Sequence, residues 1–193
     1  MRTANFDLVT VNDYLAEEYR SSVKCEYVGG LVYTRPPERN AHNLIAGNTL
    51  GSLHSRLRGK KCRPYNSDTK IRIRLSNDTR FYYPDVSVVC RPNPLDDSFQ
   101  DEPAALFEVL SRKTRRLDEG EKKDAYQTIP SLGIYVLVDQ ESPTVVAYRR
   151  TQNGFVREVY HGLEAVLPLT EIGTDLPLAE IYDGVEFGPE ADD

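Results

Sequence analysis

The segment from residue 104 to residue 110 (AALFEVL) constrains the fold more than any other part of the chain. It is short and almost continuously apolar, which predicts a central strand that is covered on both faces. Residues 81–90 (FYYPDVSVVC) and 134–139 (IYVLVD) have the same character and predict two further strands. Helices are therefore expected against the faces of the resulting sheet.

The N-terminal part of the chain combines two predicted helices with a hairpin. Residues 11–19 are expected to form a short helix, and Asn40 is the expected N-cap of a longer helix over residues 41–58. Between them, residues 24–35 alternate around a Gly-Gly pair. This pattern predicts a two-residue turn with a strand on each side.

The later part of the chain adds another helix and more strands. Asp118 and Glu121 have the spacing of a capping box, so a helix is predicted to begin at Asp118 and to end at Pro130. The mixed order predicts an α/β fold with one curved mixed sheet flanked by helices and an added N-terminal β-hairpin. The remaining predicted elements are strands at residues 68–75, 144–150 and 155–160, and a short helix at residues 178–182.

The size of the chain suits a single domain. Its 193 residues are expected to form one domain over residues 1–189, followed by a disordered acidic tail at residues 190–193. The cysteines Cys25, Cys62 and Cys90 lack metal-site spacing and are predicted to be reduced thiols of a cytoplasmic protein. The N-terminus lacks the apolar region of a signal peptide, and no run is long enough to span a membrane.

The net charge of −6 argues against a protein that coats DNA non-specifically, because such proteins neutralise phosphates with a basic surface. Two segments are nevertheless locally basic, residues 56–63 (RLRGKKCR) and residues 112–116 (RKTRR). Each could be solvated surface or could contact a phosphate backbone, and the sequence leaves both alternatives open.

Two carboxylates placed inside apolar strands are the main candidates for function. Asp85 lies in YYPDVSVV and Glu108 in ALFEVLS. Burying a carboxylate costs several kcal/mol unless another group compensates. Either residue alone could end its strand at solvent or beside an arginine. The pair together suggests a shared metal ion, because Mg²⁺ binds one or two carboxylates together with water and phosphate oxygens.

Lys122 is the candidate third member of the site. It lies four residues after Asp118 and four before Tyr126, so the three side chains line one helix face. A lysine turned toward the two acids could orient an attacking water or offset charge in a transition state. Alternatively, Lys122 could be a surface lysine paired with Asp118, and Asp118 could serve only as the helix N-cap.

Several segments occur in an order that resembles a known family. KCEYVGGLVY, FYYPDVSVVC and PALFEVLS are followed by TRRLDEGEKKDAYQTIPSLGIYVLVD and EIYDGV. They resemble the Uma-type family, whose members are named putative restriction endonucleases and are similar to the PD-(D/E)xK nuclease-like superfamily. The resemblance runs over about residues 11–187. It implies a restriction-endonuclease-like fold, an Mg²⁺ or Mn²⁺ cofactor and a nucleic-acid partner. DNA is favoured over RNA, but the sequence leaves both open. A homodimer would supply the two cleavages of a duplex.

The resemblance also implies roles for individual residues. Asp85 and Glu108 correspond to the metal-binding acids, and they form the catalytic set together with Lys122. Leu110 stands where the wider superfamily has its lysine, whereas the Uma-type family carries a lysine in the following helix. The resemblance also implies supporting roles for Glu26 and His42, although His42 could equally be a surface residue. Supporting roles are expected for Asp118 and Tyr126 from the helix face that they share with Lys122.

The chain departs from the family at residues 111–114, where it has Ser-Arg-Lys-Thr in place of the common Ser-Pro-Ser-Thr. The extra basic groups could help to hold a phosphate backbone. An alternative function is a catalytically inactive nuclease-fold protein that binds nucleic acid or a protein partner. The acidic net charge and Leu110 favour this alternative, whereas the set of Asp85, Glu108 and Lys122 favours a metal-dependent endonuclease.

Overall fold

A six-stranded mixed sheet forms the centre of the computed structural model, which describes residues 8–187. Its strand order is β11-β10-β9-β8-β6-β3. The segment predicted as the central strand is β8 (Pro103–Leu110), which pairs in parallel with β9 (Ile134–Asp139) and antiparallel with β6 (Val86–Val89). The outer strands are β3 (Arg63–Asn66), β10 (Thr144–Thr151) and β11 (Gly154–His161). The tail predicted at residues 190–193 lies outside the described residues.

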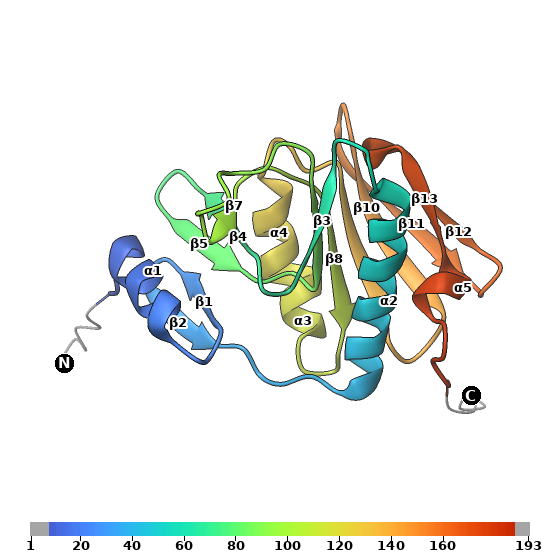
Figure 1. Cartoon of the computed structure of the whole chain (residues 1–193), viewed down its shortest axis with the longest axis horizontal. Coiled ribbons are helices and arrows are strands. Elements are labelled where there is room, and N and C mark those ends of the chain that lie inside the picture. Colours follow the sequence, from blue (N-terminus) through green and yellow to red (C-terminus); the bar gives the residue numbers. More distant parts are fainter. Residues whose placement is uncertain (1–7, 188–193) are drawn as a thin grey trace.

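Two layers cover the faces of this sheet. On one face, Phe107 and Val109 of β8 share a core with α2 (Asn40–Leu57), which lies along the sheet in Figure 1. On the other face, Leu106 and Leu110 pack in a separate core. Glu108 lies between these two in the alternation of the strand, so it belongs to the second face. The first layer also includes β12 (Val166–Leu169), a 3-10 turn (Thr170–Ile172), β13 (Thr174–Pro177) and α5 (Leu178–Ile181).

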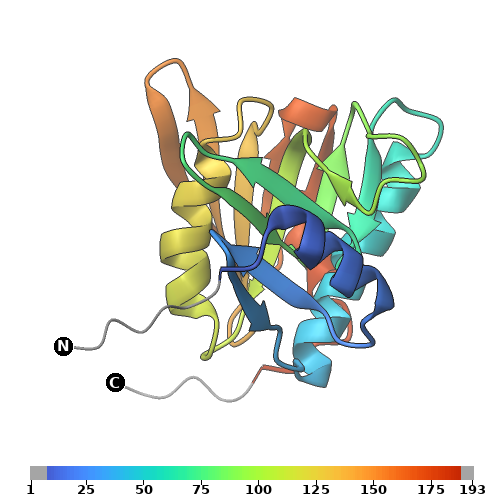
Figure 2. The same cartoon turned by 90° about the vertical axis from the view of Figure 1, so that its left-hand side faces the viewer.

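The second layer contains a separate five-stranded sheet with the N-terminal hairpin at its edge, so the prediction of one curved sheet is wrong. Gly29 and Gly30 join the two hairpin strands with φ angles of +55° and +95°, which explains the glycine pair at this turn. Tyr14 of α1 (Val11–Arg20) packs on this sheet, and Figure 2 shows α1 and the hairpin in blue, facing the viewer. The strands, in spatial order, are β2 (Leu31–Thr34), β1 (Cys25–Val28), β5 (Thr79–Tyr82), β4 (Lys70–Arg74) and β7 (Phe99–Gln100).

The chain crosses from one sheet to the other at Pro84 and Asp85. Residues 81–90 were expected to form one strand, but β5 ends at Tyr82 in the second sheet and β6 begins at Val86 in the central sheet. Proline has no N–H to donate to a strand ladder, which favours a break at this point. Asp85 therefore lies where the two sheets meet.

The helical segment after β8 begins earlier than predicted. It consists of α3 (Arg115–Leu117), a π-helical turn (Asp118–Lys122) and α4 (Lys123–Gln127). Asp118 is buried inside this segment and is not its N-cap, so the predicted capping box is wrong. The predicted cap of α2 is also wrong by one residue, because Arg39 is the N-cap and Asn40 is already helical.

A disulfide joins Cys62 to Cys90, whereas Cys25 is free. The prediction of three reduced thiols is therefore wrong. The reason lies in the register of β3 and β6, which pairs Arg63 with Val89 and thereby brings the neighbouring cysteines opposite each other. Within residues 8–187, no helix is long and apolar enough to cross a membrane.

Candidate active site

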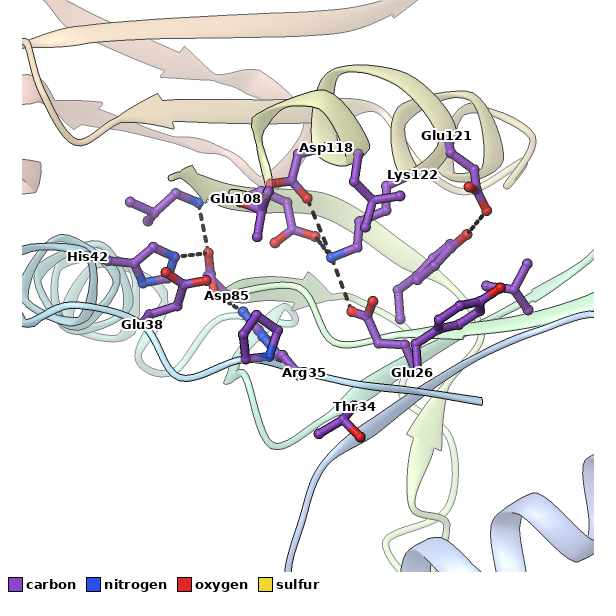
Figure 3. Close-up of a pocket in the computed structure, with 17 residues that line it drawn as sticks. Glu26, Thr34, Arg35, Glu38, His42, Asp85, Glu108, Asp118, Glu121 and Lys122 are labelled. Atoms are coloured by element: carbon purple, nitrogen blue, oxygen red, sulfur yellow. Dashed lines mark hydrogen bonds and ion pairs between the residues drawn. The ribbon is translucent and has the colours of Figure 1, made fainter. Parts of the chain in front are cut away.

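The candidate site residues meet at one cavity of about 340 Å³, which is bordered by residues from both sheets and from the helical segment after β8. Figure 3 shows their side chains approaching one another from these separate elements. Tyr126 does not line the cavity, and its hydroxyl lies behind Glu108. The candidate residues that do line the cavity are Glu26, His42, Asp85, Glu108, Asp118 and Lys122.

Asp85 is held by donors on both of its carboxylate oxygens. Oδ1 accepts a hydrogen bond from Nη2 of Arg35. Oδ2 accepts the backbone N–H of Val109 at 2.8 Å and lies 3.2 Å from Nε2 of His42. Burial alone would raise the pKa of Asp85, but His42, Arg35 and the Val109 N–H outweigh it and lower that pKa. Asp85 is therefore ionised and fixed in orientation.

Glu108 has one engaged oxygen and one that is available. Its Oε1 lies 3.5 Å from Nζ of Lys122 and accepts a hydrogen bond from the Tyr126 hydroxyl at 3.3 Å. Among the described residues, no hydrogen bond reaches Oε2. Burial raises the pKa of Glu108 well above its usual value, and the nearby Lys122 only partly opposes this shift. An additional positive charge nearby would stabilise the ionised form of this buried carboxyl group.

Lys122 points into a group of three acids. Its Nζ lies 3.1 Å from Glu26, 3.4 Å from Asp118 and 3.5 Å from Glu108 (Figure 3). Burial alone would lower the pKa of Lys122, but these carboxylates outweigh it and raise that pKa, so the ammonium stays charged. Asp118, Lys122 and Tyr126 all turn toward Glu108 or its partners, in agreement with their predicted helix face. The alternative of a surface lysine is excluded, because Lys122 is 4% exposed.

His42 lies at the start of α2 and is buried rather than on the surface. Its Nε2 faces Asp85, and its buried Nδ1 has no hydrogen-bond partner among residues 8–187. Burial lowers the pKa of His42, but the hydrogen bond and charge of Asp85 outweigh this effect and raise it. His42 therefore helps to fix the carboxylate of Asp85.

The cavity has an excess of negative charge. Its four buried carboxylates are Glu26, Asp85, Glu108 and Asp118. When all are ionised, they exceed Arg35 and Lys122 by two charges before His42 is counted. A divalent cation would balance this excess, and carboxylate oxygens are the hard ligands that Mg²⁺ prefers. Within residues 8–187, no three His, Cys, Asp or Glu side chains form a ready-made metal site, so water and substrate oxygens would complete the coordination.

Arg35 is a site residue that the sequence interpretation missed. It follows β2, and in the hairpin register Glu26 lies opposite Tyr33. Opposite residues share a face of a strand pair, and alternation returns to the same face two residues later. Glu26 and Arg35 therefore lie on the same face of the hairpin, and this alternation was the available signal. The side chain of Glu38, in the segment that leads to α2, also lines the cavity.

The family model Uma2, described as "Putative restriction endonuclease", matches residues 11–179. The chain belongs to this family. It is 31% identical over 186 residues to "Uncharacterized protein slr1290" of Synechocystis sp. (strain ATCC 27184 / PCC 6803 / Kazusa). The aligned region covers 96% of this chain and 97% of that protein. It is 27% identical over 153 residues to "Uncharacterized protein sll1609" of the same organism, and the aligned region covers 78% of this chain and 85% of that protein.

A solved structure shares the fold of this Uma2 family member. It is the crystal structure of "a putative nuclease belonging to DUF820 from Anabaena variabilis ATCC 29413". The two chains superpose with a TM-score of 0.71 at 16% sequence identity, over 90% of this chain and 97% of that chain. This similarity confirms the predicted α/β fold with a mixed sheet flanked by helices.

Proposed function

We propose that this Uma2 family member is a metal-dependent endonuclease that hydrolyses phosphodiester bonds of nucleic acid, with DNA preferred over RNA. The observation that carries the proposal is the convergence of the buried side chains of Asp85, Glu108 and Lys122 on one cavity. The descriptions of the family and of the structural neighbour agree with this function. A homodimer, which would cut both strands of a duplex, belongs to the same proposal.

Asp85 and Glu108 are the proposed holders of Mg²⁺ or Mn²⁺. Such an ion, when bound, would polarise a phosphate and lower the pKa of a water molecule. Asp85 presents a carboxylate fixed by donors on both oxygens, and Glu108 presents the oxygen that no described residue engages. Lys122 places an ammonium 3.5 Å from Glu108, where it could orient the attacking water or offset the charge of the transition state.

The other candidates act as positioning residues in this proposal. Glu26 and Asp118 hold the ammonium of Lys122, at 3.1 and 3.4 Å. The Tyr126 hydroxyl steadies Glu108 at 3.3 Å. These contacts fix the orientation of the two groups that would face the substrate, which is a large part of what a preorganised site contributes. His42 acts in the same way on Asp85.

One of the two basic segments lies beside the cavity, and we propose that it contacts a phosphate backbone. Thr114 lines the cavity, so residues 112–116 border the site. Lys113 and Arg116 are exposed and form no ion pair among the described residues. In the segment 56–63, Arg56 pairs with carboxylates of β13 and α5, and the other basic residues are exposed, but no residue of this segment lines the cavity. We therefore assign the proposed phosphate contacts to Lys113 and Arg116.

The test is a cleavage assay on plasmid, linear duplex, single-stranded DNA and single-stranded RNA, with Mg²⁺ or with EDTA. The wild type is expected to cut DNA in Mg²⁺ alone. Lys122→Met, which keeps the bulk of the side chain, should lower the rate by about 10²–10⁴-fold. Lys123→Met is the matched control, because Lys123 pairs with Asp124 outside the cavity, and it should cut at the wild-type rate.

The competing function is a catalytically inactive protein that binds nucleic acid. It would be supported if the wild type bound these substrates but cut none of them in Mg²⁺ or Mn²⁺. The position of Lys122 favours the enzyme, because its ion pairs are with the acids of the candidate site and none draws it away from them.

A further inference from the structure

Arg35 brings a second permanent positive charge into the cavity. Its Nη1 donates to the backbone oxygen of Tyr83 at 2.6 Å, and its Nη2 donates to Oδ1 of Asp85. The side chain is 16% exposed, and it lines the same cavity as Glu108 and Lys122. The guanidinium is therefore part of the site.

The contact with Asp85 falls on the oxygen that a cation would use. Oδ2 already accepts the Val109 N–H and faces His42. A carboxylate oxygen has two acceptor positions, so Oδ1, with its single donor, is the side of Asp85 that remains open. A metal ion at Oδ1 would lie beside the guanidinium of Arg35, and the two positive charges would repel each other.

The chemistry of Arg35 fits a phosphate group as well as a carboxylate. A guanidinium presents five N–H donors in a planar fork that matches phosphate oxygens. Two of these donors have acceptors in the structure, at Tyr83 and Asp85. The backbone N–H of Arg35 donates to the oxygen of Lys24 at 3.0 Å, and Pro36 follows directly. The backbone is therefore held, and three of the five side-chain donors have no acceptor among the described residues.

We propose that Arg35 is a substrate-binding residue that exchanges partners. Without metal, the guanidinium of Arg35 forms an ion pair with Asp85. When Asp85 holds the cation, this guanidinium binds the phosphate of the nucleic acid. This inference rests on the proposed function. It makes two linked claims, namely that Arg35 opposes metal binding in the free protein and that it contributes to nucleic-acid binding only in the presence of metal.

The first claim is tested by calorimetric titration of Mn²⁺ into the protein without nucleic acid. Arg35→Gln is expected to bind Mn²⁺ about tenfold more tightly than the wild type, because the competing charge is gone. Arg39→Gln is the matched control, since it makes the same charge change on the same segment at an exposed residue with no ion pair among residues 8–187. It should bind Mn²⁺ as the wild type does. Unchanged or weaker Mn²⁺ binding by Arg35→Gln would overturn the inference.

The second claim is tested by fluorescence anisotropy of a labelled DNA oligonucleotide, in EDTA and in Ca²⁺. In Ca²⁺, Arg35→Gln is expected to bind the oligonucleotide about tenfold more weakly than the wild type. In EDTA the two proteins should bind the oligonucleotide equally, because the Arg35 of the wild type is then paired with Asp85. Equal binding in Ca²⁺, or an equal loss in both conditions, would contradict the exchange of partners.

Arg35→Lys keeps the inference testable if Arg35→Gln does not fold. It retains the positive charge beside Asp85 but lacks the planar fork, so it should bind Mn²⁺ like the wild type and bind the oligonucleotide more weakly in Ca²⁺. Wild-type binding in both assays would refute the role of Arg35. If the wild type bound neither Mn²⁺ nor DNA, the proposed function itself would fail, and this inference would fail with it.

Discussion

Replacing Glu108 with glutamine should stabilise the metal-free protein. Glu108 is 2% exposed, and its pKa is raised because burial and the neighbouring Asp118 and Asp85 disfavour its charge more than Lys122 favours it. At 3.5 Å, the attraction between Glu108 and Lys122 is about 5 kcal/mol at an effective dielectric constant near 20. Transferring a charged group from water into the protein interior costs several kcal/mol, and the repulsion from Asp118 and Asp85 adds to that cost.

The raised pKa shows that the unfavourable contributions outweigh the attraction. Lys122 also keeps Glu26 at 3.1 Å and Asp118 at 3.4 Å after the substitution. We therefore expect Glu108→Gln to raise the free energy of unfolding by about 1–2 kcal/mol at pH 8, which is the usual size of a gain from relaxing a functional site.

The gain should depend on pH in a defined direction. A carboxyl group whose pKa is raised in the folded state contributes stability below its unfolded pKa, and that contribution is lost as the pH rises through the folded pKa. Glutamine has no such dependence. The advantage of Glu108→Gln should therefore be small near pH 4 and should grow as the pH rises.

The assay is urea denaturation in EDTA at several pH values, repeated in Mg²⁺. Added Mg²⁺ should stabilise the wild type and should have little effect on Glu108→Gln. The reasoning would be refuted if Glu108→Gln were less stable than the wild type at pH 8 in EDTA, because the buried charge would then be compensated already.

Three further predictions concern other contacts. Asp85→Asn should destabilise the protein by about 3 kcal/mol in urea denaturation, because it leaves a buried guanidinium without its counter-ion, and the loss should fade as the pH falls through the low pKa of Asp85. Reduction of the Cys62–Cys90 disulfide, which is closed over a separation of 28 residues, should lower the free energy of unfolding by roughly 3–4 kcal/mol, and a thiol titration of the unreduced, denatured protein should find Cys25 alone. Joint replacement of Lys113 and Arg116 with alanine should weaken DNA binding and reduce the slope of log affinity against log salt by about two; an unchanged slope would place the phosphate contacts elsewhere.

The strands β8 to β11 of the central sheet could be predicted because their patterns are local, whereas β3 was not predicted and β6 was merged with β5. Residues 134–139 and the apolar run around Glu108 carry their own signal, and the structure has strands at both places. The hairpin was equally predictable, because Gly29 and Gly30 take the positive φ angles that the turn requires. These features depend on neighbouring residues alone.

The features that were missed depend on contacts between distant residues. The hairpin alternation could have placed Arg35 on the face of Glu26, but its contact with Asp85 also requires the change of sheets at Pro84, which is not a local pattern. The disulfide follows from the register of β3 and β6, and register is a property of the paired strands. Asp118 was predicted as a cap from its spacing, whereas burial against Lys122 places it inside a π-helical turn.

The predicted site residues form two groups of contacts beside the same cavity, one around Asp85 and one around Lys122. Glu26, His42 and Tyr126 were assigned only supporting roles, and their contacts are with Lys122, Asp85 and Glu108 respectively. Their chemical roles remain predictions until they are measured.

The most direct test of the account is the position of Mn²⁺ in crystals of the protein, located by its anomalous scattering. The account predicts a peak about 2 Å from carboxylate oxygens of both Asp85 and Glu108 in the wild type, and no peak there in Glu108→Gln. An ordered Mn²⁺ bound elsewhere, or an empty cavity at millimolar Mn²⁺, would contradict the claim that this cluster of acids is a metal-dependent active site.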